Sequence, residues 1–125
     1  MTNNPVSIAE AYYSAVGRKN IAEIEKHLHP DACLIGPLAS ISGKQAVLEA
    51  TRNFAGMFNT LTIKAKFGSE NQAMIVYEVE MPDPIGTTPS ASLMTFQNGM
   101  ITKIQLFYDA RPFVVKKEEI FTSKS

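Results

Sequence analysis

The amino-acid sequence predicts an α+β fold in which helices cover one face of an antiparallel sheet. Apolar residues recur at three- and four-residue spacing in the first half of the chain, and they alternate with polar residues in much of the second half. Helices at the start and strands at the end indicate separate layers rather than alternating βαβ units. No internal repeat or linker interrupts the 125 residues. We therefore expect one domain over residues 1–113, followed by a tail over residues 114–125 that forms an edge strand or stays mobile.

Capping patterns predict three helices. A serine or asparagine followed three residues later by a glutamate or glutamine is the capping-box signature, and glycine or proline marks a helix end. By these signals the helices begin at Asn4-Pro5 or Ser7, at Asn20 and at Ser42, and the first two end at Gly17 and before Pro30. The third helix carries Phe54 and Phe58 on its apolar face.

The predicted strands comprise one short strand and four long ones. They cover residues 32–35, 61–67, 73–81, 91–97 and 100–108. The segment Pro82–Pro89 contains three prolines and one glycine, so we predict a loop there, and Asn98-Gly99 predicts a tight turn. Strict alternation in the last strand places Thr102, Ile104, Leu106 and Tyr108 on one face and Ile101, Lys103, Gln105, Phe107 and Asp109 on the other.

Composition excludes several classes of function. Twelve basic and twelve acidic residues cancel, which removes the basic footprint of a nucleic-acid binder. We also expect no membrane span, no signal peptide and, because Cys33 is the single cysteine, a cytoplasmic location. There is neither a phosphate-cradling glycine loop nor a G-x-S-x-G motif, so we expect no cofactor.

The order of elements and three motifs resemble the nuclear-transport-factor-2-like superfamily, in its SnoaL-like branch. The motifs are AYYSAVGRKNIAEIEKHLHPDACLIGP, then SGKQAVLEA, and above all FQNGMITKIQLFYD near the end. This superfamily includes polyketide cyclases, ketosteroid isomerase and scytalone dehydratase. The resemblance implies a cone, in which a strongly curved antiparallel sheet wraps around three N-terminal helices and encloses an apolar pocket. It also implies a homodimer formed through the outer face of the sheet.

The resemblance transfers catalytic groups only in part. Tyr12 falls at the oxyanion-binding tyrosine of ketosteroid isomerase. The two aspartates of that enzyme are missing, because Gly36 and Ser92 stand at their places, so steroid-type isomerisation is disfavoured. Asp109 matches the aspartate that SnoaL-like cyclases carry near the end of the last strand.

Asp109 is the first candidate for a catalytic residue. A carboxylate in an apolar pocket has a raised pKa and can shuttle protons near neutrality. A structural alternative stays open, because alternation puts Asp109 opposite Tyr108 and Arg111 is close enough in sequence to pair with it. A β-bulge would be needed to turn the carboxylate inward.

His27, His29 and Tyr12 are further candidates for acid–base or polarising roles. His27, His29 and Asp31 can in principle ligate zinc or iron, but they span a helix end and Pro30, so we predict no metal site. Either histidine can instead act as an acid or base, or interact with a helix C-terminus. Tyr12 can donate a hydrogen bond into the pocket or simply pack in the core.

The predicted ligand pocket is lined by residues of the third helix and the last two strands. They are Phe54, Phe58, Met94, Ile104, Leu106 and Tyr108. We expect a small hydrophobic molecule as the ligand. Three functions remain open: an acid–base enzyme for isomerisation, cyclisation or dehydration, a binding module without chemistry, and a homodimeric protein-interaction domain.

Overall fold

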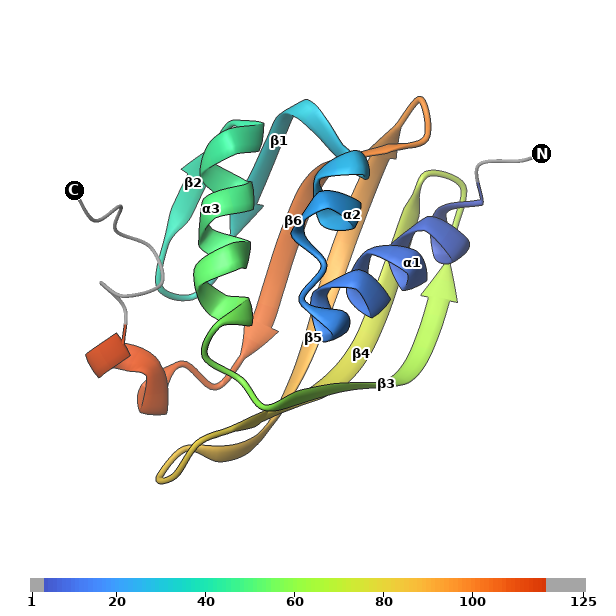
Figure 1. Cartoon of the computed structure of the whole chain (residues 1–125). Coiled ribbons are helices and arrows are strands. Elements are labelled where there is room, and N and C mark those ends of the chain that lie inside the picture. Colours follow the sequence, from blue (N-terminus) through green and yellow to red (C-terminus); the bar gives the residue numbers. More distant parts are fainter. Residues whose placement is uncertain (1–3, 117–125) are drawn as a thin grey trace.

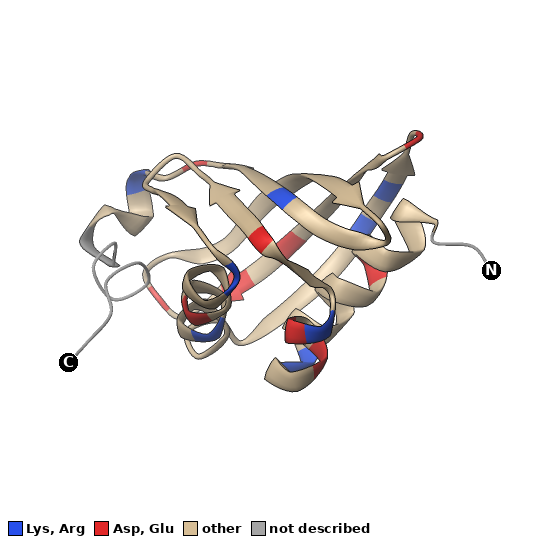
Figure 2. Cartoon of the chain, turned by 90° about the horizontal axis from the view of Figure 1, so that it is seen from above, with Lys and Arg blue, Asp and Glu red and all other residues tan. Residues whose placement is uncertain are grey.

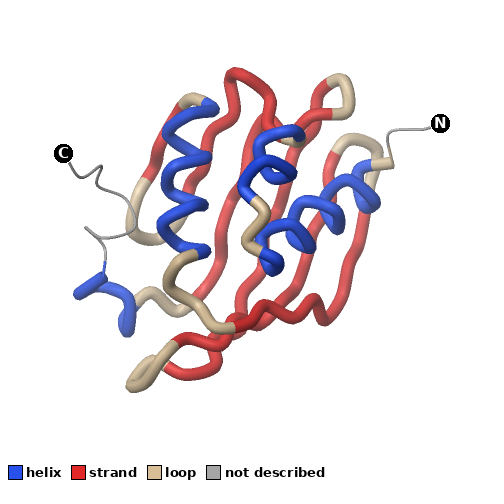
Figure 3. Tube along the Cα trace, viewed as in Figure 1, coloured by secondary structure: helices blue, strands red, loops and turns tan. Residues whose placement is uncertain are grey.

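The computed structural model describes residues 4–116, and it shows three helices on one face of a six-stranded sheet (Figures 1 and 3). In chain order the elements are α1 (Pro5–Arg18), α2 (Ile21–Lys26), β1 (Leu28–Ile35), β2 (Ser40–Ser42), α3 (Lys44–Ala55), β3 (Thr60–Gly68), β4 (Gln72–Met81), β5 (Gly86–Gln97), β6 (Met100–Tyr108) and the 3₁₀ helix η1 (Arg111–Lys116). The predicted α+β class with N-terminal helices is confirmed.

The strands lie in the order β2-β1-β6-β5-β4-β3. The predicted meander of four long strands is confirmed, since β3 to β6 pair antiparallel in succession. The sheet as a whole is mixed, however, because β1 runs parallel to β6. Curvature brings β3 and β4 around α1, so the helix is held in the concave side of the sheet (Figure 1).

Local chemistry sets the helix boundaries. The side chain of Asn4 accepts a hydrogen bond from the backbone N–H of Val6, and Asn20 caps α2 in the same way. The predicted end of α1 at Gly17 is wrong, because the left-handed C-cap residue is Lys19 with φ of 60°. Its ammonium group donates to the carbonyl of Phe58, 2.5 Å away, which fixes the side chain at this helix end.

Two further boundaries differ from the prediction. Ser42 does not cap the third helix, because it ends β2 and the cap of α3 is Gly43, with φ of 98° and no side-chain hydrogen bond. Pro30 does not terminate a helix either. It lies within β1, and α2 already ends at Lys26.

The prediction of a loop over residues 82–89 is half wrong. Strand β5 begins at Gly86, and Pro89 pairs with Glu78 in the sheet. The pairing of β4 with β5 continues through Pro89 without a register shift. Only residues 82–85 therefore connect β4 to β5. A short connection of this kind does not offer a long functional loop.

The predicted alternation of the last strand fails at its start. Ile101 pairs with Phe96 and Lys103 pairs with Thr95, which leaves Thr102 as an extra residue in a bulge. Ile101 and Ile104 are therefore both fully buried. The bulge sits at the start of β6, remote from Asp109, and does not turn that carboxylate inward.

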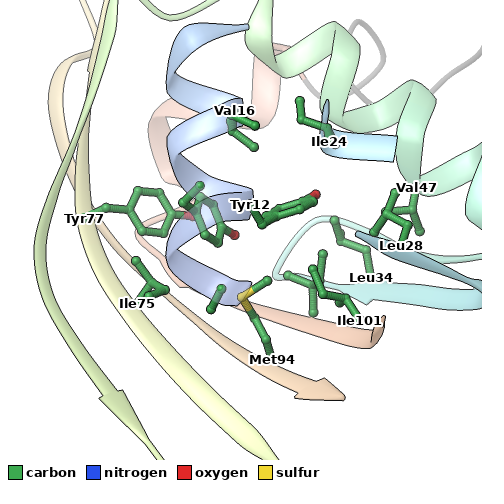
Figure 4. Packing of buried hydrophobic residues seen from close by; sticks show 14 of the residues in the cluster. Tyr12, Val16, Ile24, Leu28, Leu34, Val47, Ile75, Tyr77, Met94 and Ile101 are labelled. Atoms are coloured by element: carbon green, nitrogen blue, oxygen red, sulfur yellow. The ribbon is translucent and has the colours of Figure 1, made fainter. Parts of the chain in front are cut away.

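The core fills the space between the helices and the concave face of the sheet. Figure 4 shows Tyr77 reaching from β4 toward α1, and Tyr12 extending from α1 toward Leu34. The largest fully buried side chains of the core include Phe58, Ile24 and Met94. Within residues 4–116 no helix is long and apolar enough to span a membrane.

Charged residues of both signs are interspersed over the helices and strands (Figure 2). The first three residues of the predicted tail, 114–116, complete η1 and do not form a strand. The rest of the predicted tail, residues 117–125, lies outside the described residues.

Candidate ligand cavity

A cavity of about 80 Å³ lies between α1, α3 and the sheet. Seven elements contribute to its wall: α1, β1, α3, β4, β5, β6 and η1. Most of the wall is apolar and includes Val16, Leu34, Ala50, Phe54, Ile104 and Leu106. Phe113 of η1 completes the wall, and its ring meets the ring of Tyr108 edge-on at a centroid distance of 5.4 Å.

Four of the six residues predicted to line a pocket lie in this wall. They are Phe54, Ile104, Leu106 and Tyr108. Phe58 and Met94 are outside it, contrary to the prediction. Phe58 follows the end of α3 and packs under the ammonium group of Lys19, and Met94 is buried in the core.

Three buried hydroxyl groups form a cluster at the cavity, which we call the hydroxyl cluster (Tyr13, Tyr77 and Ser92). The Ser92 oxygen lies 2.5 Å from the Tyr13 hydroxyl and 3.2 Å from the Tyr77 hydroxyl. The two tyrosine rings stack with centroids 4.7 Å apart. Tyr13 and Tyr77 line the cavity, whereas Ser92, which is 0% exposed, supports them from behind.

Tyr12 belongs to a separate hydrogen-bond chain on the helical side of the cavity. Thr51 donates its hydroxyl proton to the carbonyl of Val47 at 2.8 Å. The Tyr12 hydroxyl lies 3.3 Å from the Thr51 oxygen. Because the Thr51 proton is already committed, Tyr12 is the donor in this pair.

The tyrosines of the cavity keep their protons at neutral pH. Burial raises the pKa of Tyr12 to about 12, against a smaller lowering by its hydrogen bond to Thr51. Burial likewise raises the pKa of Tyr13 and Tyr77, and of the half-buried Tyr108. These groups are hydrogen-bonding phenols rather than phenolates.

Asp109 lies at the surface and not in the cavity, so the predicted apolar environment is wrong. Its carboxylate pairs with the guanidinium of Arg111 at 2.7 Å and accepts a hydrogen bond from the backbone N–H of the same residue. These contacts, the side-chain hydrogen bond foremost, lower the pKa of Asp109 to about 2. The prediction of a raised pKa is therefore also wrong.

Neither histidine reaches the cavity. The His27 ring lies 3.2 Å from a carboxylate oxygen of Glu23 one helical turn earlier, and His29 accepts a hydrogen bond from the backbone N–H of Asp31. Among residues 4–116 no three His, Cys, Asp or Glu side chains come together as a metal site would require. The candidate triad of His27, His29 and Asp31 does not converge.

Sequence reasoning missed Tyr13, Tyr77 and Ser92 as one group. Tyr77 carried a usable signal, since it lies two residues from Ile75 and from Val79 and shares the buried face of β4 with them. Its meeting with Tyr13 depends on the curvature of the sheet, which the period of apolar residues does not encode.

Comparison with known proteins agrees with this architecture. The model of the SnoaL-like domain matches residues 9–104. A search of curated proteins finds no match.

Solved structures share the fold at low sequence identity. A protein from Kribbella flavida superposes with a TM-score of 0.84 at 21% identity, covering 94% of this chain and 95% of that one. An NTF2-like protein of unknown function from Cytophaga hutchinsonii superposes with a TM-score of 0.74 at 20% identity, covering 85% of this chain and 90% of that one. A steroid delta-isomerase from Pseudomonas aeruginosa superposes with a TM-score of 0.78 at 14% identity, covering 96% of this chain and 90% of that one.

These likenesses establish the NTF2-like fold. The match to the family model spans most of the chain, from α1 to the middle of β6. The chain therefore belongs to the family of SnoaL-like domains.

Proposed function

We propose that the chain binds a small, largely apolar molecule in the cavity between the helices and the sheet. The observation that carries this proposal is the composition of the wall, which combines aliphatic and aromatic side chains with hydroxyl groups. None of the described residues in the wall is an aspartate, glutamate, lysine, arginine or histidine. A charged ligand would lose its hydration there without gaining a counter-ion.

The same wall favours binding without acid–base chemistry over an enzyme. A proton shuttle needs a group that titrates near the working pH. The tyrosines of the cavity have a raised pKa, and Asp109 is exposed with its pKa lowered to about 2. Fold likeness to a steroid delta-isomerase does not supply the missing group, because Gly36 and Ser92 stand where the resemblance would require aspartates.

Thermal unfolding with a hydrocarbon probe tests the proposal. A ligand at ten times its Kd stabilises the folded state by about 1.4 kcal/mol, which raises Tm by roughly 4 to 8 °C in a domain of this size. Cyclopentane should produce such a shift in the wild type. It should produce none in Ala50→Leu, because Ala50 lines the cavity and the larger side chain fills it.

The matched control is Ala46→Leu, the same change one turn earlier on α3 at an exposed position. This variant should respond to cyclopentane like the wild type. An equal Tm shift in Ala50→Leu and Ala46→Leu would place binding elsewhere and refute the proposal.

A second proposal concerns the outer face of the sheet, which favours a homodimer. Register aligns Phe67, Met74 and Leu93 across three strands, and the neighbouring row contains Phe107. Phe67 is 61% exposed and Phe107 is 46% exposed. Large apolar side chains grouped on one face are typical of an interface.

Charge also suits a second copy of the chain on this face. Lys103 lies beside the apolar rows toward one end of the strands, and Glu78 lies beside them toward the other. A two-fold axis that runs across the strands at the centre of the face exchanges the two strand ends, and so brings the end with Lys103 of one copy toward the end with the partner's Glu78. Opposite charges then flank an apolar centre.

A further inference from the structure

The sheet ends at β3, and this edge is protected over only half of its length. No strand of residues 4–116 pairs with the outer side of β3. In its second half Lys64 is an extra residue in a bulge, and the ammonium group of Lys66 binds Glu10 of α1 at 2.8 Å. Lysines and bulges keep other strands away from a sheet edge. Residues 60–63, which we call the open edge, pair regularly with β4 and contain neither device.

A groove with about 520 Å³ of space lies between the open edge and the C-terminal part of α1. Leu61 and Ile63 belong to its wall, and they pair with buried residues of β4, so they face the helical layer. Gly17 of α1 also lines the groove. A Cβ atom at Gly17 would lie 3.6 Å from Leu61, an ordinary contact distance. The groove is separate from the ligand cavity except for Tyr13, which contributes to both walls.

Arg18 supplies the charge of this groove. It is the single charged residue among the described residues of the wall. Arg18 lies near the beginning of β3, because Gly17 before it is close to Leu61 and Lys19 after it binds the carbonyl of Phe58. Its exposed guanidinium has no ion pair within residues 4–116. A carboxylate is the natural partner for such a group.

The position of Arg18 selects the direction in which a further strand would add to the open edge. An antiparallel strand brings its C-terminal end to the beginning of β3, and therefore to Arg18. A parallel strand would bring its N-terminal ammonium group there, and two positive charges would repel. At the other end of the open edge the exposed Lys64 offers a second positive charge to the residue four positions before the C-terminus.

We propose that the groove binds the C-terminal end of a partner protein, which adds to the open edge as an antiparallel strand and places its terminal carboxylate on Arg18. Main-chain hydrogen bonds supply affinity in this mode of recognition, and alternate side chains supply specificity. Residues one and three positions before the C-terminus lie opposite Leu61 and Ile63, so apolar side chains suit them. The terminal residue and the second one before it lie opposite Thr60 and Thr62. This inference is independent of the ligand proposed for the cavity.

The probe is the peptide acetyl-Glu-Val-Thr-Val-Thr with a free C-terminal carboxylate, and its matched control is the same peptide with a C-terminal amide. Kd values are measured by NMR titration of the backbone amides of the full chain. The acid should bind the wild type about three- to fivefold more tightly than the amide, at the upper end of what an exposed ion pair contributes. Arg18→Gln should remove this preference. Arg52→Gln should keep it, since Arg52 is an exposed arginine of α3 outside the groove wall.

Two further measurements separate an added strand from a simple ion pair. Amides of residues 60–63 that point away from β4 should exchange their hydrogens more slowly when the peptide is bound. Gly17→Leu should abolish binding of both peptides, because its side chain extends into the groove. Its first side-chain atom fits without a clash, so the amide spectrum of this variant should remain that of the folded protein.

Equal affinity of the acid and the amide for the wild type would overturn the inference, as would an unchanged preference in Arg18→Gln. Binding without slower exchange at residues 60–63 would show contact with an anion but no added strand, and would overturn it as well. Slow exchange at the outward amides in the absence of peptide would show that a second copy already covers this edge, which is also contrary to the inference. Each of these results leaves the cavity untouched, because cyclopentane binding tests that site separately.

Discussion

At the scale of single residues, Asp109 shows how one residue two positions later, Arg111, can reverse a prediction. An aspartate after an apolar strand suggests a carboxylate at the mouth of a pocket, and this suggestion led to the expected raised pKa. The chain leaves the sheet after Tyr108, however, and Arg111 folds back onto the carboxylate. The ion pair with Arg111, which the sequence left open as the alternative, is what the structure shows.

The pKa of Asp109 can be measured by NMR titration of its carboxyl carbon. The folded-state pKa of about 2 lies below the ordinary value of 3.8. The pair therefore stabilises the fold at pH values above about 4, and this contribution disappears as the pH falls from about 4 to about 2. We expect a midpoint near 2 in the wild type.

Arg111→Gln should return this midpoint toward 3.8, because the guanidinium is the main cause of the shift. A midpoint above 4 in the wild type would contradict the exposed ion pair. Such a value would restore Asp109 as a candidate proton shuttle.

The tyrosines define the limit of prediction at this scale. Tyr12 was identified as a candidate through the resemblance to ketosteroid isomerase, and it does line the cavity. Tyr13 was not among the predicted site residues, yet its hydroxyl meets Ser92, which lies 79 residues further along the chain. Contacts at such separation depend on the tertiary arrangement, and single-sequence periodicity contains no information about them.

At the scale of elements, turn chemistry and strand composition were sufficient for β6. The predicted strand 100–108 matches the observed bounds, and Asn98-Gly99 forms the turn with both residues at positive φ. Proline content was misleading in the segment before β5, because Pro89 is accommodated within a paired strand. The bulge at Thr102 was also missed, since an extra residue in one strand becomes visible only when its partner strand is known.

The outer face of the sheet gives a prediction at this scale. Phe107→Glu places a charge among the apolar rows of that face and should convert a dimer into a monomer. Light scattering coupled to size-exclusion chromatography measures the change in mass. Val114→Glu is the control, because Val114 is also an exposed apolar residue, at 58%, but lies on η1 rather than on the sheet.

The expected result is a monomer for Phe107→Glu and a dimer for both Val114→Glu and the wild type. A wild-type monomer at the concentration used for these measurements would contradict the proposed interface. So would a Phe107→Glu variant that remains dimeric.

At the scale of the whole molecule, the cavity is a consequence of curvature. The sheet bends around α1, and α3 covers the opposite part of the concave face (Figure 1). Residues from seven elements then meet around a space that none of them encloses alone. Strand parity and helix spacing were enough to predict four of the lining residues. Phe113 was missed, because its place in the wall depends on how η1 folds back against Tyr108 at the end of β6.

Xenon binding measures this central feature most directly, because an apolar atom needs only an accessible apolar cavity. The chemical shift of dissolved ¹²⁹Xe is followed as wild type, Ala46→Leu or Ala50→Leu is added. We expect a protein-dependent shift that saturates for wild type and Ala46→Leu, and a shift for Ala50→Leu no larger than that of nonspecific surface contact. Equal shifts for all three proteins would contradict a ligand cavity between the helices and the sheet.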